Sequence, residues 1–317
     1  MNALLSLLRA LADPSRVRIL LLVRHMEMSV GEITAVLGQS QPRVSRHIRI
    51  LADAGLLARS KEGAWVFVRL GQPQLCTAAF ALVDALASDA GAADQARLAI
   101  VRAERAAAAD AWFAAHADEW DRERSAYVPE AAVETAIVAT LSDRPIGVLV
   151  DVGTGTGRMI ELLGQHARLA LAIDRSPEML RLARGRIEAA GLSAQTEVRR
   201  GDMYALPRSD GSANTVVLHQ VLHFADDPAA AIAESARLLS PAGRLLVIDF
   251  MPHDREELRD RQRHVRLGFA DDQVLGWMVA AGLAARVAAQ LPSPDGLGVS
   301  LWLGERPADV GVKGLAA

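Results

Sequence analysis

The stretch Val148-Leu149-Val150-Asp151-Val152-Gly153-Thr154-Gly155-Thr156-Gly157 decides the fold of this chain. Its first half is apolar and largely β-branched, which is typical of a strand buried on both faces of a parallel sheet. The alternate glycines then predict a tight turn that a ligand can approach closely, because these positions carry no Cβ atom. Leu162 and Leu163 follow Met159 at helical spacing. A helix is therefore expected to start just after Gly157 and to direct its N-terminal dipole toward the turn.

The glycine spacing in this turn is G-x-G-x-G, and Asp151 stands two residues before the first glycine. The dinucleotide fingerprint needs G-x-G-x-x-G instead, and an acid beside the turn favours a cationic or hydroxyl-bearing ligand over a pyrophosphate. The motif D-x-G-x-G-x-G after a first strand resembles motif I of class I S-adenosylmethionine-dependent methyltransferases. The resemblance implies a Rossmann-like domain of seven strands that binds S-adenosylmethionine or S-adenosylhomocysteine. It assigns ligand contacts to Asp151, Gly153, Thr154, Gly155 and Gly157.

A second acid follows a second apolar strand. Residues 169–173 read Leu-Ala-Leu-Ala-Ile and lead directly into Asp174. In a doubly wound sheet this strand end lies beside the glycine turn, where a carboxylate can accept both hydroxyl hydrogens of a ribose. The alternative is that Asp174 only caps the helix that begins at Ser176-Pro177-Glu178. Arg175 stands next to this acid, and Met179 is expected near the adenine.

The third and fourth strands also end at candidate ligand residues. The third ends at Gly201-Asp202-Met203, and the resemblance makes Asp202 the acceptor for the adenine amino group. The fourth strand and its exit span Asn214 to Phe224 and include His219, and they face the methyl-donor end of the ligand. The fifth, sixth and seventh strands are expected at residues 241–249, 284–289 and 299–303.

The sequence leaves open whether this domain transfers a methyl group. Methyl transfer from a sulfonium is an in-line displacement that depends mainly on positioning and needs at most a base for the nucleophile. The candidate bases are His219, His223, His253 and His264. Each of them is equally consistent with a structural histidine, so the catalytic residue stays unknown. A trio of thiols for arsenic methylation is absent, because Cys76 is the one cysteine of the chain.

Length and charge indicate two domains with different partners. The chain has 317 residues, which suits about two domains of ordinary size. Its net charge is −3, but residues 1–70 carry ten Lys and Arg against five Asp and Glu. A basic N-terminal part on an acidic body favours contact with nucleic acid. With one cysteine and no apolar run long enough for a membrane span, we expect a soluble, cytoplasmic protein.

Capping signals divide the N-terminal part into short helices. Asp13-Pro14 supplies an N-cap followed by proline at the first helical position. Ser29-Val30-Gly31-Glu32 is a capping box that opens a short helix, which Gly38 ends. Ser40 is then expected to cap the next helix, which contains residues 41–51.

That next helix has two different faces. At 100° per residue, Val44, Ile48 and Leu51 lie on one side, and an arginine-rich stripe lies on the other. Two predicted strands follow at 56–60 and 64–70, joined by a turn at 61–63. A recognition helix followed by a basic wing predicts a winged helix-turn-helix that binds DNA, although a solvated helix face is the simpler alternative. The expected DNA contacts are Gln41, Arg43, Ser45, Arg46, His47, Arg49, Arg59 and Lys61.

Residues 11–20 and 40–56 resemble the ArsR/SmtB family of winged-helix repressors. The resemblance implies a homodimer that binds double-stranded operator DNA and, in many members, releases it on binding a metal or metalloid. The thiolate sites of such members need paired cysteines, whereas this chain has Met26-Glu27-Met28 in the corresponding region. We therefore expect no metal at that site.

The predicted organisation is an α+β winged-helix head on an α/β body. A DNA-binding and dimerisation domain spans 1–90, a helical connector 91–144, a methyltransferase domain 145–304 and a tail 305–317. The connector is expected to hold a long helix from Asp94 to about Arg124 and a shorter one from Glu130 to Leu141. Its aromatic residues either cover the active site as a lid or pack against the sheet domain. They are Trp112, Phe113, Trp120 and Tyr127.

The order of the two domains resembles a class of fused bacterial regulators in which the body senses S-adenosylmethionine or S-adenosylhomocysteine. The first hypothesis is therefore a dimeric transcriptional regulator with one of these molecules as its effector. The alternative is an active S-adenosylmethionine-dependent methyltransferase with an unidentified small-molecule acceptor. In that case the DNA-binding head tethers the enzyme to DNA or regulates its own operon.

Overall fold

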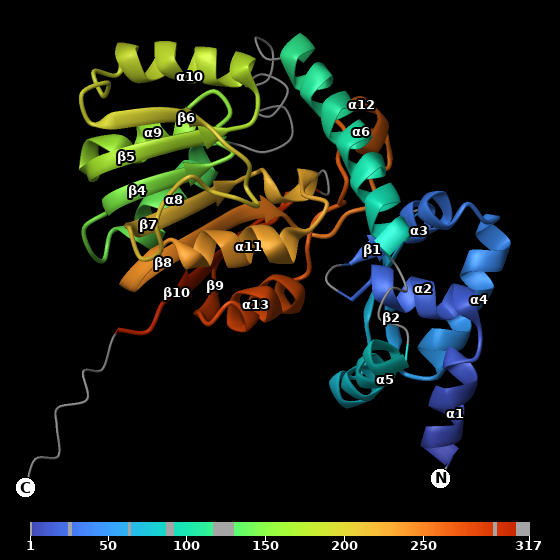
Figure 1. Ribbon diagram of the computed structural model, residues 1–317. Coiled ribbons are helices and arrows are strands. Elements are labelled where there is room, and N and C mark those ends of the chain that lie inside the picture. Colours follow the sequence, from blue (N-terminus) through green and yellow to red (C-terminus); the bar gives the residue numbers. More distant parts are fainter. Residues whose placement is uncertain are drawn as a thin grey trace, which may run out of the picture. The chain divides into compact units, whose positions relative to one another are not determined.

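The computed structural model describes residues 2–24, 27–62, 65–86, 92–116, 130–293 and 297–308 (Figure 1). The chain divides into two compact units, one built mainly from residues 1–108 and the other mainly from residues 109–317. Across the described ranges, none of the helices combines the length and the apolar character needed to cross a membrane.

The N-terminal unit is a winged helix-turn-helix, as the sequence predicts. Its helices pack against a small antiparallel sheet of order β1-β3-β2. The elements are α1 (Asn2–Leu11), α2 (Pro14–Leu22), β1 (Met28–Ser29), α3 (Val30–Leu37), α4 (Gln41–Asp53), β2 (Leu57–Glu62), β3 (Trp65–Leu70), α5 (Pro73–Leu86) and α6 (Ala92–His116). Strand β1 was not predicted, because two residues are too short to show a period.

Local capping explains where these helices begin and end. The Asp13 carboxylate accepts hydrogen bonds from the N–H groups of Ser15 and Arg16 at the start of α2. Ser29 and Glu32 form the predicted capping box of α3, and Gly38 ends that helix in the left-handed conformation. The predicted Ser40 cap is wrong in one respect, because its side chain makes no capping hydrogen bond on α4.

Helix α6 starts on the winged-helix unit. Arg18 of α2 donates two hydrogen bonds of 2.6 Å to the carboxylate of Asp94, and Leu98 joins the buried cluster of this unit. These contacts extend the compact unit past residue 90. The predicted continuation of the helix to Arg124 and the aromatic residues Trp120 and Tyr127 lie outside the described residues, as does the side chain of Phe113. Trp112 is half-buried.

The C-terminal unit contains a sheet of seven strands in the order β6-β5-β4-β7-β8-β10-β9. Neighbouring strands from β6 to β8 are parallel, and β10 runs antiparallel to both β8 and β9. The strands are β4 (Gly147–Val152), β5 (Ala167–Asp174), β6 (Thr196–Arg200), β7 (Ala213–His219), β8 (Leu239–Phe250), β9 (Ala284–Leu291) and β10 (Val299–Glu305). This arrangement confirms the predicted Rossmann-like fold.

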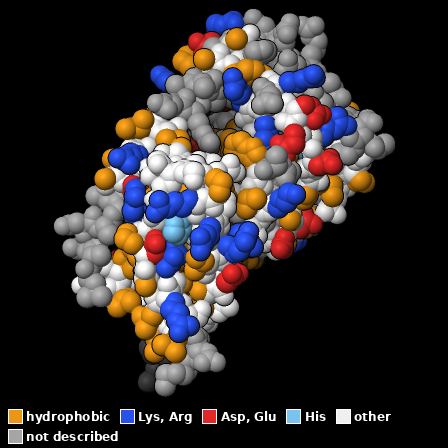
Figure 2. Space-filling view, turned by 90° about the vertical axis from the view of Figure 1, so that its right-hand side faces the viewer, with side chains coloured by type: hydrophobic (Ala, Val, Ile, Leu, Met, Phe, Trp, Pro, Cys, Tyr) orange, Lys and Arg blue, Asp and Glu red, His pale blue; other side chains and the backbone are white. Residues whose placement is uncertain are grey.

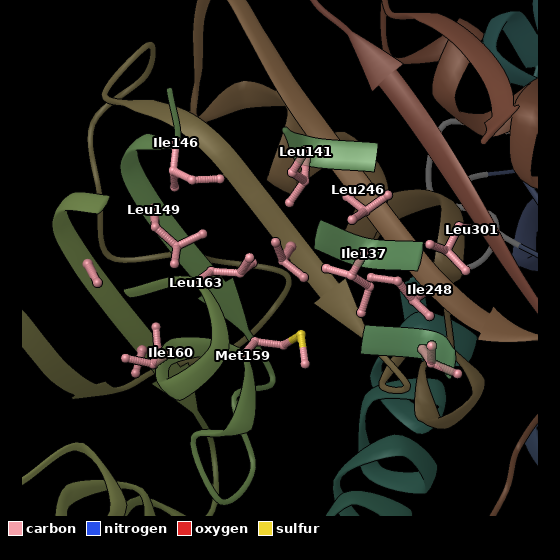
Figure 3. Close-up of a cluster of buried hydrophobic side chains, with 14 of the residues drawn as sticks. Ile137, Leu141, Ile146, Leu149, Met159, Ile160, Leu163, Leu246, Ile248 and Leu301 are labelled. Atoms are coloured by element: carbon pink, nitrogen blue, oxygen red, sulfur yellow. The ribbon is translucent and has the colours of Figure 1, made fainter. Parts of the chain in front are cut away.

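Helices cover both faces of this sheet. They are α8 (Glu130–Leu141), α9 (Arg158–Leu163), α10 (Pro177–Ala189), α11 (Pro228–Arg237) and α13 (Asp271–Ala280), and the short α12 (Glu257–Arg261) follows β8 in the chain. One buried cluster joins α8, α9 and α10 to the sheet through residues such as Ile137, Met159 and Ile187 (Figure 3). A second cluster joins α11 and α13 to the other face through Ile232 and Met278. Because β6, β5, β4 and β7 are parallel neighbours, their carboxyl ends lie together at one edge of the sheet.

Candidate functional site

The glycine turn after β4 has the backbone geometry that its sequence predicts. Gly153, Gly155 and Gly157 have φ angles of +71°, +52° and +85°, in the left-handed region that favours glycine. The N–H groups of Gly153 and Thr154 donate to the carbonyl of Ile173, at 2.8 and 2.9 Å. The turn is thereby tied to β5.

Gly153 also lies at a position where there is no room for a side chain. A Cβ atom there would lie 2.3 Å from Cγ2 of Val221. We expect Gly153→Ala to lower the free energy of unfolding of the C-terminal domain by about 2–4 kcal/mol, because overpacking adds to left-handed strain. Gly191→Ala is a matched control, since Gly191 has the same φ of +71° with nothing within 4 Å of its Cβ position. Denaturant unfolding of both variants checks this prediction, and equal losses would contradict it.

Two acids stand against this turn. Asp151 is fully buried, and its Oδ2 accepts a hydrogen bond of 2.5 Å from the Thr154 hydroxyl. Asp174, the last residue of β5, accepts the N–H of Gly155 at Oδ2 and the N–H of Ser176 at Oδ1, each at 2.9 Å. Burial raises the pKa of Asp174, and these amide donors oppose that rise. The Asp174 carboxylate is therefore hydrogen-bonded both to the glycine turn, through Gly155, and to Ser176, which is the N-cap of α10.

A cavity opens at the carboxyl edge of the sheet around this turn. Eleven of the twelve predicted ligand residues line it: Asp151, Gly153, Thr154, Gly155, Asp174, Arg175, Met179, Gly201, Asp202, Met203 and His219. Gly157 is the exception, because it packs toward α10, where its Cβ position lies 3.1 Å from Cα of Ala183. Gly157 therefore serves the packing of α10, and its contact with the ligand stays a prediction.

The same cavity is also lined by residues that were not among the twelve predicted ligand residues. They include Arg158, Met159, Tyr204, Gln220, Val221, Phe224 and Asp226. Arg158 and Met159 come from the first turn of α9, and the others come from the segments after β6 and β7, where no strand pattern marks them. Gln220 has a φ of +49°, an uncommon conformation for a residue with a side chain.

The four candidate bases separate into two groups. His219 lines the cavity. His223 is buried, with its Nδ1 2.7 Å from Oδ1 of Asp249, and its ring centroid lies 4.2 Å from that of His264. Burial and the positive charge of neighbouring groups hold the pKa of His264 well below its ordinary value. His253 contacts Phe250, which also stacks on His264. The last three histidines thus belong to one cluster around Phe250.

The arginine-rich face of α4 is exposed together with the wing. Six of the eight predicted DNA-binding side chains are exposed: Gln41, Arg43, Arg46, Arg49, Arg59 and Lys61. Ser45 is half-buried. On the face that Figure 2 shows, several Lys and Arg side chains gather around one His side chain, and others are spread over the rest of that face. His47 does not fit the predicted contact with DNA, because the residue is buried at 8% exposure. Its Nδ1 lies 3.8 Å from Oδ1 of Asp13, so it belongs to the contact between α4 and α2.

Fold and site define a protein of two parts, a winged helix-turn-helix and a methyltransferase-type sheet domain. Residues 13–59 match the family described as "Bacterial regulatory protein, arsR family", and residues 150–247 match "Methyltransferase domain". The chain therefore carries an ArsR-family helix-turn-helix domain followed by a class I methyltransferase domain.

Relatives match one domain at a time. The arsenical resistance operon repressor of Escherichia coli is 42% identical over 67 residues, which cover 21% of this chain and 57% of that one. The demethylmenaquinone methyltransferase of Thermus thermophilus is 37% identical over 108 residues, 33% of this chain and 47% of that one. The chain spans about half the length of the curated relatives it matches. A solved methyltransferase of Thermotoga maritima has a TM-score of 0.49 at 22% identity, covering 62% of this chain and 99% of that one.

Proposed function

We propose that the protein is a dimeric DNA-binding transcriptional regulator whose methyltransferase-fold domain binds S-adenosylmethionine or S-adenosylhomocysteine as its effector. The observation that carries this proposal is the cavity at the carboxyl edge of the sheet, with the glycine turn and Asp174 in its wall. A regulator needs a ligand site and a DNA-binding face, and the chain provides candidates for both.

The order of the strands gives the cavity a direction that suits an adenosyl amino acid. Asp202 follows β6, Asp174 ends β5, the turn follows β4 and His219 ends β7, in the order in which these strands lie in the sheet. In this arrangement Asp202 and Met203 would bind the adenine, and Asp174 the two ribose hydroxyls. The turn would then contact the amino-acid part, and His219 would lie toward the sulfur.

An apolar surface on the first helix supports the dimer. Leu4, Leu5 and Leu8 of α1 are 56%, 44% and 43% exposed, and Leu82 of α5 is 37% exposed. Large apolar side chains gathered on the surface are typical of protein interfaces. We therefore propose that α1 and α5 contribute to the contact between two copies of this chain.

The alternative function, methyl transfer, keeps one supporting observation, which is His219 in the cavity wall. The other three candidate bases lie in the cluster around Phe250. Calorimetric titration of the full chain with each ligand, combined with a turnover assay using labelled S-adenosylmethionine and cell extract, tests the proposal. We expect binding without label transfer. Transfer that is lost in Gly155→Asp would favour the enzyme, and absence of binding would contradict both functions.

A further inference from the structure

Arg158 connects the wall of the cavity to helix α8. It is the first residue of α9 and lines the cavity. Its Nε donates to Oε1 of Glu134 at 2.6 Å and its Nη2 donates to Oε2 at 2.7 Å, which is the paired geometry of a strong guanidinium–carboxylate contact. Its Nη1 also donates to Glu161 at 2.6 Å. These carboxylates raise the pKa of Arg158, so the guanidinium stays charged.

The next residue makes the same connection through apolar contact. Met159 lines the cavity and is 2% exposed. It belongs to the same buried cluster as Val133 and Ile137 of α8 (Figure 3). Two consecutive residues therefore contribute to the cavity wall and also hold α8, one by an ion pair and one by packing.

Helix α8 is the first described element of the methyltransferase domain after residues 117–129. The chain on the other side of those residues is α6, which begins on the winged helix through the Arg18–Asp94 ion pair. Glu134 lies one turn from the end of α8 that faces this connection in the sequence. Its side chain is 15% exposed, and it does not line the cavity.

We propose that the Arg158–Glu134 ion pair couples occupation of the cavity to the position of α8, and that the effect of the ligand on DNA affinity depends on this pair. This inference rests on the proposed effector function. A ligand that contacts Arg158 and Met159 fixes the start of α9, and the ion pair then holds α8 in one position. The ligand thereby favours one position of α8, and a ligand-dependent preference of this kind is the physical basis of coupling between distant sites.

Glu134→Gln tests this relay, because it keeps the size of the side chain and removes the charge that pairs with Arg158. Glu161→Gln is the matched control, since Glu161 also bonds to Arg158 but lies on α9 itself. We expect S-adenosylhomocysteine to bind both variants within about threefold of wild type. In wild type and Glu161→Gln it should change DNA affinity by about 5- to 150-fold, the usual range of such coupling. In Glu134→Gln the change should fall below about twofold.

Amide hydrogen exchange provides a second measurement that does not depend on DNA. We expect S-adenosylhomocysteine to slow exchange in residues 130–141 of wild type and not of Glu134→Gln. Undiminished coupling in Glu134→Gln, an equal loss in Glu161→Gln, or equal protection of α8 in both proteins would overturn the relay. If the bound ligand does not change the DNA affinity of the wild-type protein, the proposed function is contradicted instead. The exchange measurement would still decide whether the ion pair connects the cavity to α8.

Discussion

Asp174→Ala is expected to weaken binding of S-adenosylhomocysteine by about 100-fold or more. Two hydrogen bonds from ribose hydroxyls to a carboxylate contribute about 1.5–3 kcal/mol each, and 1.4 kcal/mol corresponds to a tenfold change in affinity. The same carboxylate accepts the N–H of Gly155, so its removal also loosens the turn. Calorimetric titration of the full chain measures this loss.

Two comparisons make this result specific. Asp174→Asn keeps one acceptor oxygen and the volume of the side chain, so its loss should be smaller than that of the alanine variant. Without ligand, the DNA affinity of Asp174→Ala should stay within about twofold of wild type, because Asp174 is not part of the DNA-binding face. If Asp174→Ala bound the ligand as tightly as wild type, ribose recognition at this residue would be wrong.

The combined variant Arg43→Ala, Arg46→Ala and Arg49→Ala is expected to lower DNA affinity by about three orders of magnitude or more. These side chains are exposed along one helix. Each charged contact to a phosphate contributes about 1.5 kcal/mol or more. Each also adds about 0.9 to the slope of log affinity against log salt concentration, so the slope should fall by about 2.7 for each subunit bound to the DNA. Anisotropy titrations on a labelled duplex at several salt concentrations measure both quantities.

A control with the same change in net charge separates local contacts from overall attraction. Arg168, Arg181 and Arg184 are exposed arginines of the methyltransferase domain. Replacing all three by alanine should leave the salt dependence nearly unchanged. Equal effects of the two triple variants would mean that α4 is not the recognition helix.

The sequence predicted the positions of candidate site residues best where these residues lie at the ends of parallel strands. Asp151, Asp174 and Asp202 each follow an apolar strand, and strand order alone brings such ends to one edge. Arg158 could not be assigned in this way, because its place in the wall depends on how α9 packs on α8. The motif alone also does not reveal that the conformation of Gly157 serves the contact with α10.

A similar limit applies to the winged helix. The helical period correctly separates the buried Val44 and Ile48 from the exposed Arg46. It does not reveal that Asp13, at the start of α2, lies beside His47. Burial of a residue at the edge of an apolar stripe depends on the neighbouring helix, and the period of one helix carries no information about that neighbour.

The most direct test of the account is fluorescence anisotropy of the full chain on DNA from upstream of its own gene, with S-adenosylmethionine and S-adenosylhomocysteine titrated separately. The account predicts that at least one ligand shifts the dissociation constant for DNA by about 5- to 150-fold, and that Asp174→Ala abolishes the shift. If both ligands bind in calorimetry and neither moves the DNA curve, the claim that the methyltransferase domain is an effector sensor is contradicted.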